Sequence, residues 1–382
     1  MRFPEFADEW KQTTLGEIAE IIQTRGKSNT LYLSVESFLP NFRGISVSLN
    51  GIQSSGVIFG TYDTLMSNIR PYLRKVWYAD CGGTCSSDVL VFRGKSVIHP
   101  RFLYTIIANQ SFVDYTMQGA KGVKMPRGDK QQMLLYSLSL PSLAEQKKIA
   151  SFLSLIDERI QCLSETIKER KREKATLLNQ LFSQTLRFPL FFDEWQQTTL
   201  GEVAEITSGY SGEQEQMETP YRVSRIETIS SGVIDIERVG FVSYDAKLVA
   251  YKLSLGDILF SNINSIEHIG KSAIVSRPID LYHGMNLLRL KAINIDPYVL
   301  YYHLQRDVVR NRFRSIANKA VSQASINQTT LGKEPVLLAP TLAEQKKIAY
   351  FLSLLDERIE VEEELLEQYE RQKRYLLRQM FV

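Results

Sequence analysis

The chain of 382 residues contains two copies of one sequence unit. Residues 2–21 and 187–206 differ at four of twenty positions, and residues 143–160 and 342–359 differ at two of eighteen. A duplication of this extent predicts two structural units built on one plan. Between these nearly identical stretches the copies diverge, which predicts a shared scaffold that carries two different surfaces.

Each copy contains a long helical segment, which begins at Ser142 in the first copy and at Thr341 in the second. Both starts have a hydroxyl residue at the N-cap and a glutamate three residues later, which is the pattern of a capping box. Neither segment then contains Pro or Gly, so helices of about 40 residues, roughly 60 Å long, are predicted. Apolar residues follow at alternating steps of four and three, as in the seam of a coiled coil. The predicted seam residues are Ile149, Leu153, Ile156, Ile160, Leu163, Ile167, Leu177, Leu181, Ile348, Leu352, Leu355, Ile359, Leu366, Leu376 and Met380.

The two long helices are expected to pair antiparallel with each other. Three residues separate the end of the first helix at Ser183 from the second copy at Arg187. Parallel pairing would require the second globular segment to reach back along the whole helix before the second helix begins. We therefore expect one globular segment at each end of a paired-helix rod. Because the end of the chain aligns just ahead of its own beginning, Val382 is expected to lie close to Met1.

The globular segments, residues 1–141 and 184–340, are predicted to be mixed α+β domains. Short β-rich runs alternate with turns that contain Gly, Asn and Asp. Helices are predicted after His99 and after Asp296, where proline occupies the first helical position. The long helices at 142–183 and 341–382 complete a pseudo-twofold repeat of two α+β domains and an antiparallel coiled coil.

Composition excludes several classes of protein. The chain has 46 basic and 43 acidic side chains, for a formal net charge of +3, so total charge alone does not indicate nucleic-acid binding. Three cysteines do not suit a disulfide framework. There is no apolar run of about 18 residues and no signal peptide, so a cytoplasmic protein is expected.

The sequence lacks the short motifs of nucleotide and DNA enzymes. None of the Gly-Lys-Ser tripeptides, at Gly26, Gly94 and Gly270, has the upstream glycine of a P-loop. There is no Pro-Pro pair for an amino-methyltransferase motif, no Pro-Asp pair for a metal-dependent nuclease, and no triad pattern around the four histidines. Cys81 and Cys85 are interpreted as part of a turn and not as a metal site. We therefore expect a noncatalytic chain that binds no metal and no cofactor directly.

Candidate DNA-binding residues occur in clusters of basic and amide side chains. Arg and Lys contact phosphates and guanine, whereas Asn and Gln can read adenine. The alternative interpretation of each cluster is an ordinary solvated loop or helix face, and this is preferred for the charged run 168–174 on the coil. The candidates are Asn68, Arg70, Arg74, Lys75, Lys121, Lys124, Arg127, Asn262, Asn264, Lys271, Arg312, Arg314, Lys319, Gln323 and Asn327.

The duplicated motifs resemble those of the specificity subunits of type I restriction-modification systems. The resemblance covers the whole chain and rests on the RFPxFxDEW and TTLGE openings and on the two LAEQKKIA helices. Residues 256–261 and 270–275 are similar to the family segments Gly-Asp-Ile-Leu-x-Ser and Gly-Lys-x-Ala-Ile-Val. The counterpart in the first copy, residues 65–70, lacks the Gly-Asp pair, which leaves its DNA-facing loop less well assigned.

The resemblance implies that the variable segments, residues 1–141 and 184–340, are target recognition domains that each read one half of a split DNA sequence. It also implies that the paired helices at 142–183 and 341–382 fix the spacer. The implied partners are double-stranded DNA, two methyltransferase subunits that use S-adenosylmethionine, and restriction subunits that use ATP and Mg. Glu145, Gln146, Glu344 and Gln345 at the helix starts are expected to contact these subunits or, alternatively, to cap their helices. Two other functions remain open: a coiled-coil adaptor that binds proteins, and a stand-alone sequence-specific DNA-binding regulator.

Overall fold

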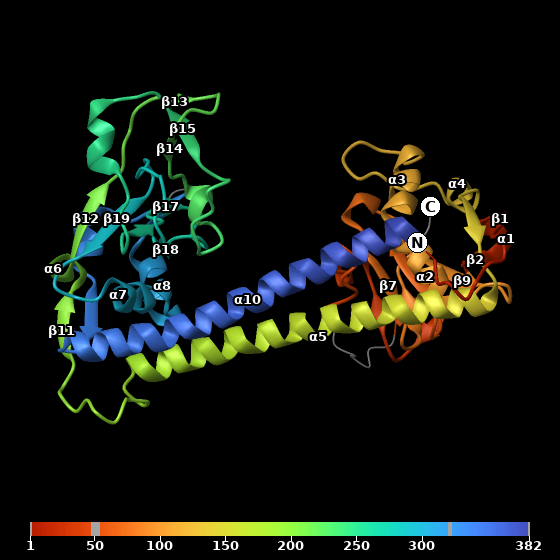
Figure 1. The fold of residues 1–382 in the computed structure, drawn as a ribbon, viewed down its shortest axis with the longest axis horizontal. Helices are drawn as coiled ribbons and strands as arrows, with labels where there is room; N and C mark the ends of the chain where they lie inside the picture. The colour runs from red at the N-terminus through yellow and green to blue at the C-terminus, as the bar shows by residue number, and fades with distance from the viewer. Residues whose placement is uncertain (1, 47–53, 320–322, 381–382) are drawn as a thin grey trace. The chain divides into compact units, whose positions relative to one another are not determined.

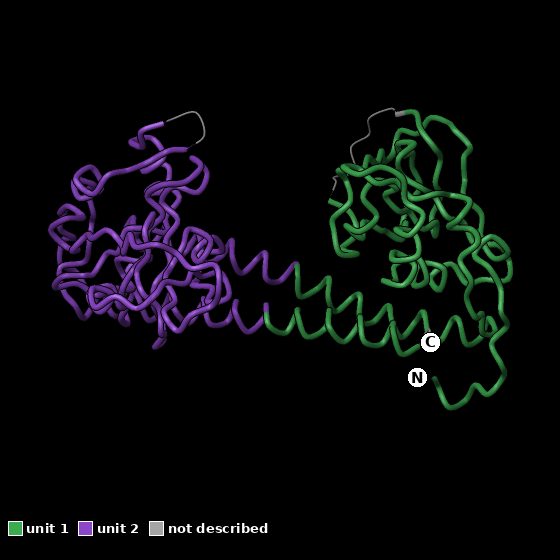
Figure 2. The backbone as a smooth tube through the Cα atoms, turned by 90° about the horizontal axis from the view of Figure 1, so that it is seen from above, with its two compact units in different colours: residues 1–164, 364–382 green, residues 165–363 purple. Residues whose placement is uncertain are grey.

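The computed structural model describes residues 2–46, 54–319 and 323–380. The chain divides into two compact units: Met1–Ser164 with Glu364–Val382, called unit 1, and Glu165–Glu363, called unit 2 (Figure 2). Each unit holds one globular segment and parts of both long helices. Met1 and Val382, which the repeat predicts to lie close together, fall outside the described residues.

A pair of strands closes the globular segment of unit 1. β1 (Lys11–Thr14) runs antiparallel to β10 (Ser137–Leu140), with Lys11 opposite Leu140. This pair, called the clasp, brings together the beginning and the end of the segment. α1 (Leu15–Ile18) follows directly, because the Thr14 N–H donates to the Glu17 carboxylate at 3.0 Å in a capping box.

Two four-stranded sheets and several helices form the rest of the segment (Figure 1). The order of the first sheet is β2 (Ala19–Ile22), β9 (Val89–Gly94), β6 (Thr64–Ser67) and β7 (Val76–Tyr78). The order of the second sheet is β3 (Arg25–Ser28), β5 (Ser54–Phe59), β8 (Gly83–Cys85) and β4 (Tyr32–Leu33). The helices are α2 (Pro100–Ile107), α3 (Gln110–Gln118) and α4 (Lys130–Leu134), with 3-10 turns η1 (Val35–Ser37) and η2 (Pro71–Leu73).

The helix predicted after His99 is confirmed as α2 and packs on the first sheet. Phe102 and Leu103 of this helix are fully buried and share a core with Met66 and Phe92 of the sheet. Proline at the first helical position has no N–H of its own that would need a partner, and its fixed φ suits a helix. These two properties explain why the helix begins there. Burial of these apolar side chains is the main stabilising contribution to unit 1.

Unit 2 repeats the framework of unit 1. Its clasp is β11 (Gln196–Thr199) against β22 (Pro335–Leu338), followed by α6 (Leu200–Val203). Its four-stranded sheet has the same order as the first sheet of unit 1: β12 (Ala204–Ser208), β19 (Leu288–Ala292), β16 (Ile258–Phe260) and β18 (Ser272–Ile274). The helix predicted after Asp296 is confirmed as α7 (Pro297–Gln305), and α8 (Asp307–Ile316) and α9 (Gln328–Gly332) follow.

The two units differ in their remaining sheets. In unit 2 these are three-stranded: β13 (Gln214–Glu215), β15 (Gly240–Val242) and β14 (Tyr221–Val223) form one, and β17 (Ile263–Asn264), β21 (Ala324–Ser325) and β20 (Asn318–Lys319) form the other. The 3-10 turns are η3 (Ile226–Ile229) and η4 (Ala246–Tyr251). The nearly identical sequences build the first clasp strand, the short helix after it and the beginnings of the long helices. The divergent sequences build most of the four-stranded sheet that the units share as well as the sheets that differ.

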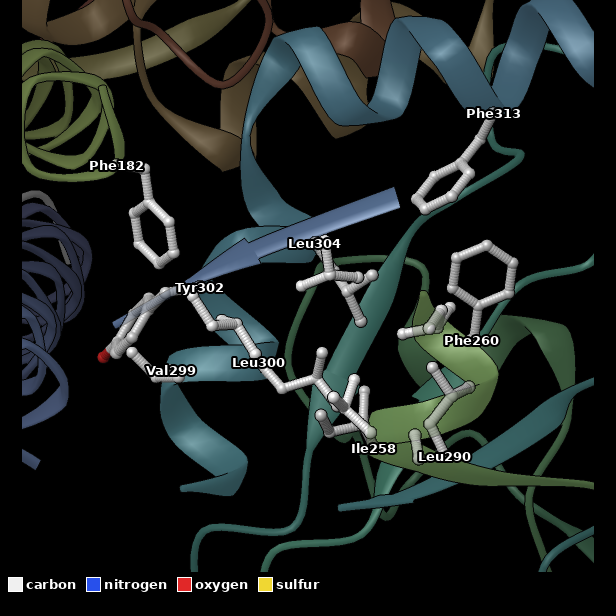
Figure 3. Close-up of a cluster of buried hydrophobic side chains, with 14 of the residues drawn as sticks. Phe182, Ile258, Phe260, Leu290, Val299, Leu300, Tyr302, Leu304 and Phe313 are labelled. Atoms are coloured by element: carbon white, nitrogen blue, oxygen red, sulfur yellow. The ribbon is translucent and has the colours of Figure 1, made fainter. Parts of the chain in front are cut away.

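Apolar side chains from α5, α7, α8 and the sheet meet in the core of unit 2 (Figure 3). Phe260 of β16 and Phe313 of α8 lie edge to face, with ring centroids 5.1 Å apart. Phe182 at the end of α5 belongs to the same cluster as Leu300 and Leu304 of α7. The end of the long helix is therefore fixed into the domain core.

The long helices α5 (Leu143–Phe182) and α10 (Leu342–Met380) pair antiparallel within each unit, as predicted. In unit 1 the beginning of α5 packs on the end of α10, where Leu153 shares a core with Met380. In unit 2 the end of α5 packs on the beginning of α10, where Leu181 shares a core with Leu352.

The predicted seam residues are all buried or half-buried. The half-buried ones are Ile160, Leu177, Leu355 and Leu366. Leu178 is more deeply buried than Leu177, since it turns into the core of unit 2 and not along the helix pair.

Candidate nucleic-acid interface

Two basic clusters that are distant in the sequence of unit 1 meet in its structure. Lys121 and Arg127 pair across a tight antiparallel loop, and Arg127 also pairs with Ile69. The Arg70 N–H donates to the Pro126 carbonyl at 2.8 Å. Residues 121–127, called the basic hairpin, are therefore anchored on the turn that leads into η2.

The basic hairpin exposes most of its side chains. Lys121 forms an ion pair with Asp129 at 3.3 Å, and Arg127 forms one with Asp88 at 3.0 Å, but all four of these side chains remain in contact with solvent. Lys124 at the tip is exposed. These exposed pairs contribute little to stability and can be exchanged for contacts to phosphate.

Three other candidates in unit 1 are less accessible. Asn68 is 8% exposed, and its Oδ1 has no hydrogen-bond partner among the described residues. The Lys75 ammonium donates to the Val35 carbonyl at 2.9 Å, so it already stabilises the fold. Arg74 is half-buried, and its own backbone lies in the left-handed region, with a φ of 56°. Arg70, by contrast, is exposed.

Two of the candidates in unit 2 line a cavity of about 210 Å³. Asn264 and Lys271 line this cavity together with His268. The Lys271 ammonium donates to the Ser230 carbonyl at 2.7 Å. Asn262 is 8% exposed, and its Nδ2 donates to the Ile326 carbonyl at 3.3 Å.

The arginines of α8 separate into paired and unpaired groups. The Arg312 guanidinium forms an ion pair with Glu334, which weakens its candidacy for DNA contact. Arg306, Arg310 and Arg314 recur every four residues, so they follow one face of the helix. Among the ion pairs of the described residues, none joins these three to a carboxylate.

The face formed by Arg306, Arg310 and Arg314, called the arginine ridge, has no ion pair among the described residues, although Arg310 donates to the Gln305 side chain and Asp307 favours its charged form. Burial lowers the pKa of Arg306 and of Arg310. Arg306 lies over the Phe182 ring at 5.3 Å, and the Arg314 guanidinium donates to the Glu267 carbonyl at 3.0 Å. A half-buried cation that forms no ion pair with a carboxylate favours an anion from outside the fold. The predicted set contained Arg314 and missed the other two, although their four-residue spacing could have indicated them.

The last predicted candidates of unit 2 lie near β20 and β21. Lys319 and Gln323 are exposed. Asn327 caps α9, because its Oδ1 accepts from the Thr330 N–H at 2.8 Å. A cap explains this asparagine without any ligand.

The prediction that Glu145 and Glu344 contact partner subunits is corrected by their burial. Each is 1% exposed. Arg2 donates to both Glu145 oxygens, at 2.7 and 2.8 Å, and the Trp10 indole donates at 3.2 Å. Arg187 and Trp195 hold Glu344 in the same way. The RFPxFxDEW motif therefore connects the beginning of each sequence copy to the start of a long helix.

Gln146 and Gln345 are also interior residues, so their predicted partner contact is corrected as well. They are 1% and 4% exposed. The side-chain oxygen Oε1 of Gln146 accepts from the His99 N–H at 2.8 Å, and Oε1 of Gln345 accepts from the Asp296 N–H at 2.8 Å. Each glutamine thus fixes the start of α2 or α7 to the start of a long helix.

The exposed surface that the two copies share includes two pairs of leucines. Leu143 and Leu342 are 51% and 49% exposed, and Leu155 and Leu354 are 63% and 43% exposed. Among the described residues, no group of His, Cys, Asp and Glu side chains is arranged to hold a metal ion. Within the same residues, no helix has the length and apolar character that crossing a bilayer requires.

Residues 7–170 and 192–371 match the family described as Type I restriction modification DNA specificity domain. The chain belongs to this family. The matched stretches cover most of both units, and the family identity predicted from the duplicated motifs is confirmed.

Relatives with this specificity domain occur in archaea and bacteria. The putative type I restriction enzyme MjaX specificity subunit of Methanocaldococcus jannaschii is 41% identical over 196 residues, which are 50% of this chain and 46% of that protein. The MjaVIII specificity subunit of the same organism is 24% identical over 400 residues, covering 99% of this chain and 92% of that protein. The EcoDI specificity subunit of Escherichia coli is 25% identical over 192 residues, covering 48% and 42%.

Solved structures show the same specificity-subunit fold. The S subunit from M. genitalium has a TM-score of 0.62 at 17% identity, over 98% of this chain and 96% of that chain. A chain from a study of complex assembly in a type I R-M system has a TM-score of 0.57 at 17% identity, over 97% of both chains. The predicted architecture of two α+β domains with long helices is confirmed.

Proposed function

We propose that this chain is the DNA sequence-specificity subunit of a type I restriction-modification enzyme. Each recognition domain reads one half of a bipartite target, and the paired helices fix the spacer between the halves. The observation that carries the proposal is one framework built twice, with different polar loops on each copy. A protein that reads two unrelated half-sequences needs this combination of constant scaffold and variable surface.

The DNA contacts are expected on the basic hairpin and Arg70 in unit 1 and on the arginine ridge in unit 2. Exposed Lys121, Lys124 and Arg127 suit contacts to the sugar-phosphate backbone. Exposed amide side chains close to these basic residues in the sequence, such as Gln323, suit adenine recognition. Two such domains in one chain gain discrimination through effective concentration, because binding of one half-site presents the other.

The chain is expected to act without catalysis of its own, in the cytoplasm, as a scaffold for two methyltransferase subunits and for restriction subunits. S-adenosylmethionine, ATP and Mg would be bound by those partners. The duplicated leucines Leu143 and Leu342, with Leu155 and Leu354, support two equivalent docking sites, since exposed apolar side chains at matching positions suit identical partners.

Methylation of a genome tests this proposal. The chain is expressed with a methyltransferase subunit of a type I system from the same source in a host that lacks adenine methylation, and methylated adenines are mapped. One bipartite motif with a constant gap is the expected result. Exchange of residues 187–340 for those of another family member should change one half-motif and leave the other intact. Absence of any bipartite motif, with the complex assembled, would favour the adaptor alternative.

A further inference from the structure

The tip of the basic hairpin carries two apolar side chains that nothing in unit 1 covers. Val123 is 100% exposed and Met125 is 53% exposed. They alternate with the exposed bases Lys124 and Arg127. Exposed apolar side chains in a strongly basic loop are poorly explained by solvation, since water favours polar residues at a loop tip.

The hairpin is held in place by contacts at its base. Lys121 and Arg127 exchange two backbone hydrogen bonds of 2.9 Å each. Gly122 has a φ of +100°, which a residue with a side chain rarely adopts. A Cβ atom on Gly128 would lie 2.3 Å from the Met133 side chain and 2.7 Å from the Thr116 side chain. The close approach of this glycine seats the base of the hairpin against α3 and α4.

A preorganised loop with an apolar tip and basic flanks has the chemistry of a wedge for duplex DNA. Apolar side chains inserted between base steps unstack them and kink the duplex, and flanking cations hold the adjacent phosphates. A loop that is already ordered loses little conformational entropy on insertion. A protein partner would instead be expected to meet an apolar surface with few charges at its centre.

We propose that Val123 and Met125 insert into the base stack of the half-site read by unit 1, while Lys121, Lys124 and Arg127 contact the flanking phosphates. This inference rests on the proposed function and deepens it. Specificity at that half-site then comes partly from how easily one base step is opened, and flexible pyrimidine-purine steps are favoured there.

Fluorescence of 2-aminopurine tests the insertion. The probe replaces in turn each adenine of the unit 1 half-site and of its flanking base pairs, on either strand, except the methylated adenine, where base flipping by the methyltransferase would raise the signal independently. The full methyltransferase complex is used. A several-fold increase at one step is expected with the native chain and should disappear in the double variant Val123→Ser, Met125→Ser. Affinity for the target should fall by roughly tenfold or more.

Two further variants separate insertion from other effects. Lys124→Ala should weaken binding and reduce its salt dependence while the fluorescence increase persists at saturation. Val97→Ser changes an exposed valine, 48% exposed, outside the hairpin and should alter neither signal.

Unchanged fluorescence and affinity in the double variant would overturn the wedge, as would a double variant that no longer assembles with the methyltransferase. If the native complex reads a bipartite motif yet unstacks no step, the wedge is wrong and the proposed function stands. If the native complex prefers no bipartite target, the proposed function itself is wrong.

Discussion

Two histidines of unit 2 lie inside the fold. Burial lowers the pKa of His303 to about 3 and that of His283 to about 4. His303 lies against the Phe182 ring, with centroids 5.7 Å apart. Its Nδ1 has no hydrogen-bond partner among the described residues. The environment therefore favours the neutral ring.

This burial predicts acid sensitivity of unit 2. A histidine whose pKa is lower in the folded state contributes its full stability above its unfolded pKa of about 6.5, and that contribution is lost as the pH falls toward the folded pKa. At pH 5 the loss is about 2 kcal/mol for His303. Thermal melts at pH 7.5 and pH 5 should show a smaller decrease in Tm for His303→Gln than for the native chain. The exposed His268→Gln serves as control and should retain the native decrease.

The arginine ridge predicts a measurable electrostatic contribution to DNA binding. Each phosphate contact removed lowers the slope of log affinity against log salt by about 1. In the assembled complex, Arg310→Ala and Arg314→Ala should each flatten the slope by roughly this amount. Arg172→Ala, on an exposed part of α5, should leave it unchanged. Equal slopes for all three variants would remove the ridge from the DNA-binding surface.

Within the helix pair, charged residues interrupt the apolar seam at matching positions. Lys373 pairs with Asp157 at 2.5 Å in unit 1, and Lys174 pairs with Asp356 in unit 2. Burial opposes the charged form of Lys373, but Tyr104 and Asp157 hold its pKa above the usual value. Polar residues at seam positions are known to specify register in coiled coils, because a slipped register leaves them unpaired. The pairs thus favour one antiparallel alignment.

Two leucines that lie two residues apart on different faces of α5 separate the stability of the helix pair from its surface. Leu153 is fully buried, whereas Leu155 is 63% exposed. Leu153→Ala should lower the free energy of unfolding by about 2–5 kcal/mol through lost burial and a residual cavity. Leu155→Ala should change it by less than about 0.5 kcal/mol. Chemical denaturation measures both values.

The second of these variants, Leu155→Ala, also tests partner docking. Leu155→Ala, if it folds normally, should weaken capture of the methyltransferase in a pull-down of the full chain. Normal capture by this variant would move the docking surface away from the leucines.

Elements with a local signal were predictable, and those that depend on distant partners were not. The long helices follow from capping residues and an uninterrupted apolar period, and α2 and α7 follow from proline after a cap. The junction of the basic hairpin with Arg70 has no local signal, because it depends on backbone bonds between separate loops. Glu145 was misinterpreted for a related reason: its capping position is local, whereas Arg2 and Trp10, which bury it, lie at the start of the chain.

At the scale of the molecule, the duplicated helices are expected to set the gap between half-sites. Deletion of four residues from each long helix should shorten the nonspecific spacer, since it removes roughly 6 Å of rise, close to two base pairs of B-DNA. Four residues rotate the following helix by about 40° only, so the seam is approximately preserved. Both half-sequences should remain the same. Mapping of methylated adenines gives the spacer directly, and an unchanged gap would contradict the idea.

The clasp has a consequence for how new specificities arise. In each unit, the strands that enter and leave the recognition segment lie side by side, in the same antiparallel arrangement. A different recognition segment can therefore be joined at the same two adjacent strand ends, while the core around the long helices stays the same. The sequences that flank the two recognition segments are nearly the same, at residues 2–21 and 187–206 and at residues 143–160 and 342–359. Genetic recombination between homologous copies can therefore exchange one reading domain at a time and generate a new target in a single event.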